Sequence, residues 1–195
     1  MPTIEKPLIE YCQFVGAAPL SAGVQSGAAL NWFGTDATGG TSSDVAPVPS
    51  TADGGTKSYY VAQTLEGCMG DRAKIDIKIN TTPKPSTTTY LAYCQGVVAP
   101  RLDAVGSVLK WYRNSTDTEW QGYPYTPFTE KVQDYSFWVT QTGSNGCESP
   151  KEEIKIHIKA KPSATISGNS TIDLGQDAFI NINFTAEGPW EYVLS

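Results

Sequence analysis

The side chains best suited to chemistry in this sequence are four cysteines: Cys12, Cys68, Cys94 and Cys147. Zinc sites built from thiolates use closely spaced pairs of cysteines, and no two of these are close in sequence, so a zinc centre is not expected. Disulfides are the better interpretation, and four cysteines allow three pairings. Because disulfides persist in oxidising compartments, the cysteines indicate a protein that works outside the cytosol.

The single histidine, His157, is the only candidate for a proton-transfer role. It lies in "IKIHIK" between Lys155 and Lys159, on the polar phase of an alternating pattern, so we expect it at the surface and not as a general base. The only adjacent carboxylates, Glu152 and Glu153, precede this pattern like a solvated turn and do not indicate an acid pair for sugar hydrolysis. We expect no catalytic residue and no enzymatic activity.

Metal and cofactor sites are not indicated either. The sequence holds no DxDxDG calcium loop, and Asp36, Asp44 and Asp53 lack the spacing of calcium ligands. We therefore expect no cofactor, with a single calcium site as the alternative left open.

The charge of the chain limits its partners. With 14 basic and 20 acidic residues and a net charge of -6, it offers no basic surface for nucleic acid or for an anionic membrane. No apolar run approaches the roughly 18 residues that span a bilayer. The segment after Met1 also lacks the basic and apolar regions of an export signal, so we expect any such signal to lie outside this sequence.

The sequence repeats itself, and the repeat positions the cysteines. The second copy follows the first by 82 residues at its start and by 79 after a shortened loop. The matching pairs are "EYCQ" (10–13) and "AYCQ" (92–95), "LNWF" (30–33) and "LKWY" (109–112), "EGC" (66–68) and "NGC" (145–147), and "KIDIKI" (74–79) and "EIKIHI" (153–158). Each copy is long enough to form a small domain of its own.

Both copies read as β-strands. In each isoleucine segment apolar and polar residues alternate with period two, which is typical of a strand with one buried face. The aromatic segments "SYYVAQT" and "SFWVTQT" are joined to the isoleucine strands by Gly-containing turns, which predicts hairpins. We expect an all-β chain of tandem immunoglobulin-like β-sandwich modules, with Trp32 and Trp111 in the cores.

The order Cys, Trp, Cys in each copy is that of immunoglobulin domains, with one departure. The second cysteine comes later than in antibody domains, after the strand and in the turn, so the bridge lies outside the core. On this basis we pair Cys12 with Cys68 and Cys94 with Cys147, which would lock each module separately.

The expected domains follow from these repeats. We place repeat 1 at 1–80, a linker at 81–88, repeat 2 at 89–160 and the truncated start of a third β module at 161–195. The linker belongs to the Pro- and Thr-rich segment "NTTPKPSTT" at 80–88. The third module should contain a strand near 178–186, and Trp190 should have a structural part in it.

One feature distinguishes the copies. The segment "EWQGYPYTPF" of the second copy brings together four aromatic residues, whereas its counterpart in the first copy has none. Such rings can form a platform for sugars or for another surface, and the alternative, which we prefer, is that they shield the core or pack on a neighbouring module. The residues are Trp120, Tyr123, Tyr125 and Phe128.

The signature "YC…P…L…LxWY/F…P…YYVxQT…GC…IxIxI", at 11–79 and 93–158, resembles the Ig-like repeats of giant surface proteins of the Bacteroidota, above all SprB-type gliding-motility adhesins. Residues 162–195 are similar to a second repeat type of these proteins. The resemblance implies export by type IX secretion, display at the outer-membrane surface and a role in adhesion. Related repeats also occur as accessory modules of secreted polysaccharide-degrading enzymes.

Together these observations predict an extracellular, non-catalytic stalk segment. The expected partners are neighbouring repeats of the same polypeptide, and surface polysaccharide or other cell-surface proteins are further candidates. Nucleic acid and membrane insertion are not expected. The alternative is a set of accessory glycan-binding modules of a secreted enzyme.

Overall fold

A computed structural model describes residues 1–168, 171–177, 179–185, 188, 191 and 193. These residues form eleven β-strands and no helix, so the predicted all-β class is confirmed. The chain divides into two compact units. The first unit comprises Met1–Pro83 and Thr142–Pro150, and the second comprises Lys84–Gln141 and Lys151–Ser195.

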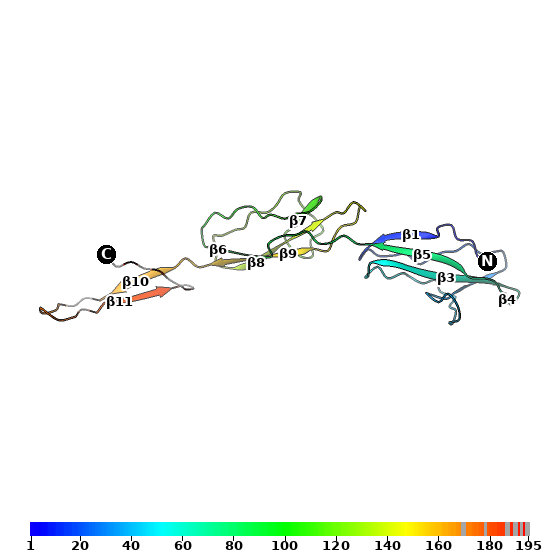
Figure 1. Cartoon of the computed structure of the whole chain (residues 1–195), viewed down its shortest axis with the longest axis horizontal. Helices are drawn as coiled ribbons and strands as arrows, with labels where there is room; N and C mark the ends of the chain where they lie inside the picture. Colours follow the sequence, from blue (N-terminus) through cyan, green and yellow to red (C-terminus); the bar gives the residue numbers. More distant parts are fainter. Residues whose placement is uncertain (169–170, 178, 186–187, 189–190, 192, 194–195) are drawn as a thin grey trace. The chain divides into compact units, whose positions relative to one another are not determined.

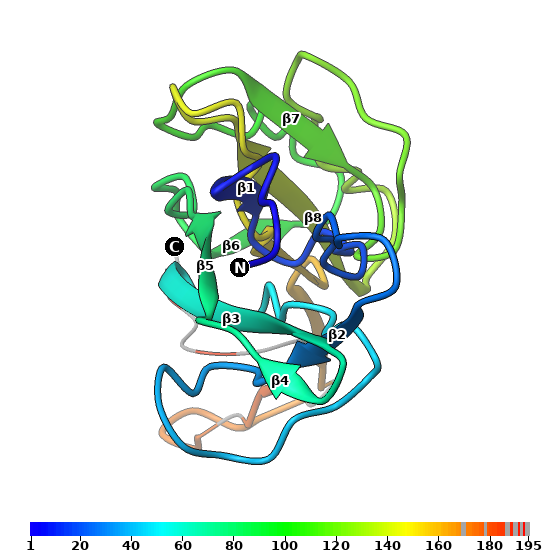
Figure 2. The same ribbon diagram turned by 90° about the vertical axis from the view of Figure 1, so that its right-hand side faces the viewer.

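The first unit contains one sheet with the strand order β1-β5-β3-β2, and the short β4 pairs with β3 (Figures 1 and 2). β1 runs parallel to β5, and the other neighbours are antiparallel. The strands are β1 (Leu8–Cys12), β2 (Ala29–Trp32), β3 (Gly55–Leu65), β4 (Cys68–Met69) and β5 (Ala73–Asn80).

The second unit contains an equivalent sheet with the order β6-β9-β8-β7, in which β6 runs parallel to β9. It also contains a separate antiparallel pair, β10 and β11. The strands are β6 (Tyr90–Cys94), β7 (Leu109–Tyr112), β8 (Asp134–Gln141), β9 (Glu152–Lys159), β10 (Ser163–Ser167) and β11 (Asn181–Thr185).

Each four-stranded order reproduces part of an immunoglobulin-type sandwich. In that fold strands C, F and G are adjacent in one sheet, and strand C carries a buried Trp. β2, β3 and β5 have this arrangement, with Trp32 only 3% exposed, and β7, β8 and β9 have it with Trp111 at 2%. The modules are therefore Ig-like, and the prediction for both tryptophans is confirmed.

The isoleucine strands form the centre of each core. Ile75 and Ile77 of β5, like Ile154 and Ile156 of β9, are at most 1% exposed, whereas the residues between them face outward. Burying each such side chain contributes about 1.5–3 kcal/mol. Two separate core clusters result, one in each repeat, so each repeat buries apolar surface of its own.

Extended segments supply the rest of each core. Leu20 belongs to the first cluster, and its amide donates to the carbonyl of Pro47 at 3.0 Å. Leu102 belongs to the second cluster, and its amide donates to the carbonyl of Tyr125 at 2.9 Å. The two leucines are 82 residues apart, like the matching "YCQ" segments, so the repeat extends to the packing of these loops.

The division of the chain differs from the expected domains in two places. The connection from β8 to β9, at 142–150, belongs to the first unit although its sequence lies in repeat 2. The expected linker also takes part in packing, because Thr82 is buried and Ser86 forms a β-bridge with Val105. In the third module, β11 lies within the expected strand, and Trp190 lies outside the described residues.

Candidate functional site

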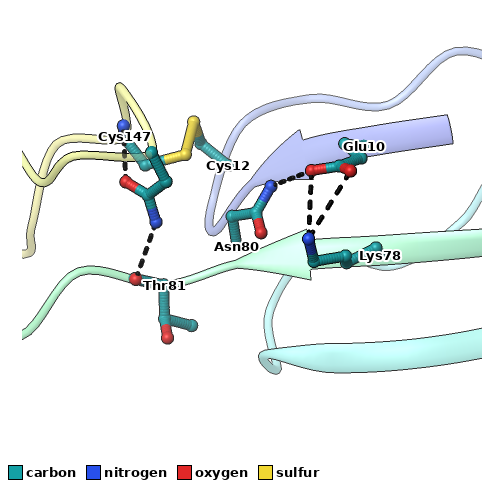
Figure 3. Close-up of polar contacts among 7 residues, drawn as sticks. Glu10, Cys12, Lys78, Asn80, Thr81 and Cys147 are labelled. Atoms are coloured by element: carbon teal, nitrogen blue, oxygen red, sulfur yellow. Dashed lines mark hydrogen bonds and ion pairs between the residues drawn. A yellow bond between two sulfur atoms is a disulfide. The ribbon is translucent and has the colours of Figure 1, made fainter.

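A disulfide joins Cys12, the last residue of β1, to Cys147 in the connection between β8 and β9 (Figure 3). The two Cα atoms are 5.4 Å apart, and 135 positions separate the residues in sequence. Cys68 and Cys94 are free and exposed. The expected pairing of Cys12 with Cys68 and of Cys94 with Cys147 is therefore wrong.

The parallel pairing of β1 with β5 explains this correction. Cys12 lies opposite Asn80, at the end of β5, whereas Cys68 precedes the start of β5 at Ala73. Eight strand residues separate the two ends of β5 by about 25 Å, and a disulfide needs Cα atoms within about 7 Å. A cysteine at the end of the first strand thus cannot reach the hairpin of its own repeat.

We call Cys12 and Cys94 the strand cysteines, and Cys68 and Cys147 the hairpin cysteines. Cys94 lies opposite Lys159 at the end of β9, and Cys147 precedes the start of β9. The same separation therefore holds in the second repeat. The observed bond joins the strand cysteine of repeat 1 to the hairpin cysteine of repeat 2.

The turn after β1 fixes the position of Cys12. The amide of Gln13 donates to the carbonyl of Asn80 at 3.0 Å, and the amide of Val15 donates to the carbonyl of Cys12 at 3.3 Å. The hydroxyl of Thr51 donates to the carbonyl of Val15 at 2.7 Å. These hydrogen bonds fix the backbone around Cys12 in addition to the disulfide.

The loop that carries Cys147 is held on the other side of the bond. The hydroxyl of Thr82, which is buried, donates to the carbonyl of Cys147 at 2.8 Å. The side chain of Asn145 accepts from the Cys147 amide at 3.0 Å and donates to the carbonyl of Thr81 at 3.1 Å (Figure 3). The Thr82 hydroxyl and the Thr81 carbonyl therefore hold the loop by hydrogen bonds in addition to the disulfide.

Gly143 allows this close approach. A Cβ atom at this position would lie 2.6 Å from the hydroxyl oxygen of Thr82 and 2.9 Å from the Asn145 side-chain oxygen. The roles of Gly143, Thr82 and Asn145 were not predicted from the sequence. The available signal was the additional residue of "GSNGC" relative to "LEGC", which alters the hairpin of the second copy.

A small polar network lies beside the bond on β1 and β5. The carboxylate of Glu10 accepts from the side-chain amide of Asn80 at 2.6 Å and pairs with Lys78 at 3.4 Å (Figure 3). The hydrogen bond from Asn80 and the charge of Lys78 lower the pKa of Glu10 below its usual value. These contacts fasten β1 to β5 next to Cys12.

The four aromatic residues of the second repeat divide into two groups. Tyr125 packs on the core, with its ring stacked 4.7 Å from that of Phe137. Trp120, Tyr123 and Phe128 are 52%, 61% and 51% exposed. The structure therefore removes Tyr125 from the candidate contact residues and leaves three rings accessible.

His157 is half-buried on β9 and pairs with Asp134 of β8. It lines a surface groove together with Tyr90, Tyr135 and Lys155. The nearby hydroxyl of Ser136 donates to Glu153 at 2.7 Å and not to the histidine. The arrangement is a contact between side chains of adjacent strands and does not have the hydrogen-bond order of a serine nucleophile with its base.

In the described part of the chain, no group of three or more His, Cys, Asp or Glu side chains is arranged to hold a metal ion. No helix long and apolar enough to cross a membrane is found among the same residues.

Comparisons with known proteins give structural likenesses only. No protein-family model and no curated protein matches this chain. The chain is similar to human mucin-like protocadherin EC1-2, at 11% identity over 83% of this chain and 99% of that one, with a TM-score of 0.30. It is also similar to the fibronectin(III)-like modules of Clostridium thermocellum CbhA, at 14% identity over 82% and 95% of the two chains, with a TM-score of 0.32. A third likeness is to an endo-fucoidan hydrolase of glycoside hydrolase family 107, at 16% identity over 79% of this chain and 28% of that one, with a TM-score of 0.30.

Proposed function

We propose that this chain is a non-catalytic spacer segment of a secreted bacterial cell-surface adhesin, of the gliding-motility type exported by type IX secretion. The observation that supports this most is the disulfide between Cys12 and Cys147, which joins two repeats that each have a core of their own. A bond of this kind limits how far the chain can be drawn out when its ends are pulled. That property suits a segment that carries load between a cell and a distal binding region.

The disulfide also supports a location outside the cytosol, because cytosolic thiols are kept reduced. Labelling of intact producing cells with an antibody against this segment tests the location. We expect labelling without permeabilisation, and loss of the signal after brief protease treatment of whole cells. Labelling that requires permeabilised cells would contradict surface display.

The spacer role has its own test. Replacing residues 1–160 in the parent protein by unrelated Ig-like domains of the same total length should preserve adhesion of the cells to a surface. Loss of adhesion with normal surface display would show that the segment binds a ligand itself.

The exposed rings of Trp120, Tyr123 and Phe128 favour a second candidate function, in which these modules accompany a secreted glycan-active enzyme and contact polysaccharide. Exposed aromatic rings that lie together can mark a surface that binds a ligand or another protein. However, Lys110 lies over the Trp120 ring, with its ammonium nitrogen 5.2 Å from the centroid, so one face is already occupied.

Affinity electrophoresis against a panel of host and algal glycans separates the two candidates. Retention that is lost in Trp120→Ala and kept in Phe14→Ala, a matched change at an exposed ring of the first repeat, would favour the glycan-binding module. We expect equal mobility of all three proteins on every glycan, as an inert spacer requires.

A further inference from the structure

The two free cysteines have the same positions in the repeat as the two bonded ones. Cys94 ends β6 as Cys12 ends β1, and Cys68 follows the hairpin glycine of repeat 1 as Cys147 follows that of repeat 2. The chain therefore carries one unused strand cysteine and one unused hairpin cysteine.

The turn after Cys94 is built like the turn after Cys12. The amide of Gln95 donates to the carbonyl of Lys159 at 2.8 Å, and the amide of Val97 donates to the carbonyl of Cys94 at 3.2 Å. The hydroxyl of Thr129 donates to the carbonyl of Val97 at 2.6 Å. Each bond matches one around Cys12, so the backbone that presents the sulfur is already formed at Cys94.

The remaining parts of the two turns also agree. The side-chain amide of Gln95 donates to the carbonyl of Glu130 at 2.9 Å, as that of Gln13 donates to Ala52 at 2.7 Å. The residue two positions after each strand cysteine has a positive φ, 64° at Phe14 and 73° at Gly96. The turns after Cys12 and Cys94 therefore have equivalent conformations throughout.

Each hairpin cysteine follows a glycine with a positive φ, although the second hairpin is one residue longer than the first. Cys68 follows Gly67, with a φ of 80°, and Cys147 follows Gly146, with a φ of 77°. Cys147 is 2% exposed in its bond, whereas Cys68 is exposed. Both left-handed glycines turn the chain so that the following cysteine lies at the end of its hairpin.

We infer that Cys94 and Cys68 are the two open ends of a repeated cross-link, and that Cys94 of one copy of this chain forms a disulfide with Cys68 of a second copy, head to tail. The inference rests on the observed Cys12–Cys147 bond and is independent of the surface display proposed above. Such a contact joins unlike surfaces and leaves one cysteine of each kind open, so it extends into a chain of copies.

Charge complementarity supports a second copy of this chain as the partner. At the observed bond Thr82 contacts the side chain of Asn145 at 3.2 Å between oxygen atoms. Counted from the matching isoleucine strands, Lys161 takes the place of Thr82, and Glu66 takes the place of Asn145 before the hairpin glycine. Both are exposed. The hydrogen-bonded pair beside the Cys12–Cys147 disulfide thus corresponds to an oppositely charged pair, Lys161 and Glu66, beside the proposed Cys94–Cys68 disulfide.

The chemistry needs an oxidant, and a small-molecule disulfide such as oxidised glutathione supplies it. The Cys94 thiolate attacks one sulfur of oxidised glutathione and releases one glutathione thiolate, which takes up a proton. The Cys68 thiolate of the second copy then attacks the Cys94 sulfur of the mixed disulfide and releases the second glutathione. Two protein thiols are oxidised to one disulfide, and one glutathione disulfide is reduced to two thiols.

The test uses the whole chain with its Cys12–Cys147 bond intact, incubated with oxidised glutathione and run on non-reducing gels. The unmodified chain should give a ladder of dimers, trimers and larger species that reductant collapses to monomer. Cys68→Ser alone and Cys94→Ser alone should remain monomers, and an equimolar mixture of the two should stop at a dimer. Peptide mapping of that dimer should show Cys94 linked to Cys68.

The charged pair is tested in the same mixture. Glu66→Lys, placed in the copy that donates Cys68, should slow dimer formation about two- to five-fold, and Lys161→Glu in the copy that donates Cys94 should do the same. Combining the two changes should restore the rate. Equal rates in all combinations would contradict the proposed contact between these residues.

Other results would overturn the inference. A Cys68–Cys94 bond within one molecule, equally rapid dimers of each single variant through identical cysteines, or no cross-linked species at all would each do so. The exposed positions of both cysteines make misfolding of the serine variants a poor explanation, and an intact Cys12–Cys147 peptide in each variant checks this directly.

Discussion

The disulfide between Cys12 and Cys147 predicts a large and specific change in how far the chain can be stretched. When the chain is held by its ends, tension passes from Cys12 through the sulfurs to Cys147 and bypasses the 135 positions between them. β1 up to Cys12 and β9 remain in the path of the force, whereas β3, β5 and β8 lie inside the closed loop.

The magnitude follows from the length of the loop. A fully extended chain spans at most 3.3–3.6 Å per residue, so opening a loop of 135 positions releases about 450–490 Å. Two within-repeat bonds, as the sequence suggested, would instead give two releases of roughly 180–200 Å each. The two connectivities therefore differ in both the number and the size of the steps.

Optical tweezers with handles at the two termini measure this directly. We expect the fully stretched, oxidised chain to lengthen by a single step of that size when reductant is added under force. Cys12→Ser should show the full length from the start, and the double variant Cys68→Ser, Cys94→Ser should behave like the unmodified chain. Two short steps, or equal lengths before and after reduction, would refute the reasoning.

Three other changes have expected results. Gly143→Ala places a Cβ atom 2.6 Å from the Thr82 hydroxyl oxygen, so it should destabilise the loop by about 1–3 kcal/mol and speed reduction of the disulfide by dithiothreitol. The pKa of Asp76 is lowered by its contact with a neighbouring lysine and by a serine hydroxyl. The unmodified chain should therefore lose stability as pH falls below about 4, and Asp76→Asn should not show this loss. Tyr125→Ala should cost about 2–3 kcal/mol in urea unfolding, and Tyr123→Ala less than about 0.5 kcal/mol.

The controls for these changes come from the same chain. Gly16→Ala, at a glycine with no atom near the added methyl group, should leave the reduction rate unchanged. The sign for Asp76 follows from its depressed folded pKa: the stabilisation is present above the unfolded value and is lost as the carboxylate is protonated. Equal acid sensitivity with and without the carboxylate, or equal effects of the two tyrosine changes, would contradict these explanations.

Much of the fold was predictable from local pattern. Alternation in "KIDIKI" and "EIKIHI" predicted β5 and β9, because a strand with one buried face sends every second side chain to the core. The internal repeat predicted two sheets with the same strand order, and the shared Trp32 and Trp111 predicted the two cores.

The disulfide was not predictable in the same way, because it depends on pairing between distant strands. Spacing shows that Cys12 lies near the start of repeat 1 and that Cys68 lies in a turn, but not that β1 runs parallel to β5. That direction places the strand cysteine at the far end from its own hairpin. Antiparallel packing of the first strand would have brought the expected pairs closer together.

The side-chain directions in the aromatic segment were also not predictable from the sequence. Four rings within ten residues indicate a patch, but an extended loop sends neighbouring side chains in different directions. Tyr125 faces the core because the Tyr125 carbonyl accepts from Leu102, which fixes this part of the loop over Phe137. The sequence alone contains no periodicity that separates it from Tyr123.

Non-reducing peptide mapping of the oxidised chain tests the central claim most directly. A peptide containing Cys12 should be linked to a peptide containing Cys147. A peptide in which Cys12 is linked to Cys68 would show that each repeat is closed separately and would contradict the account.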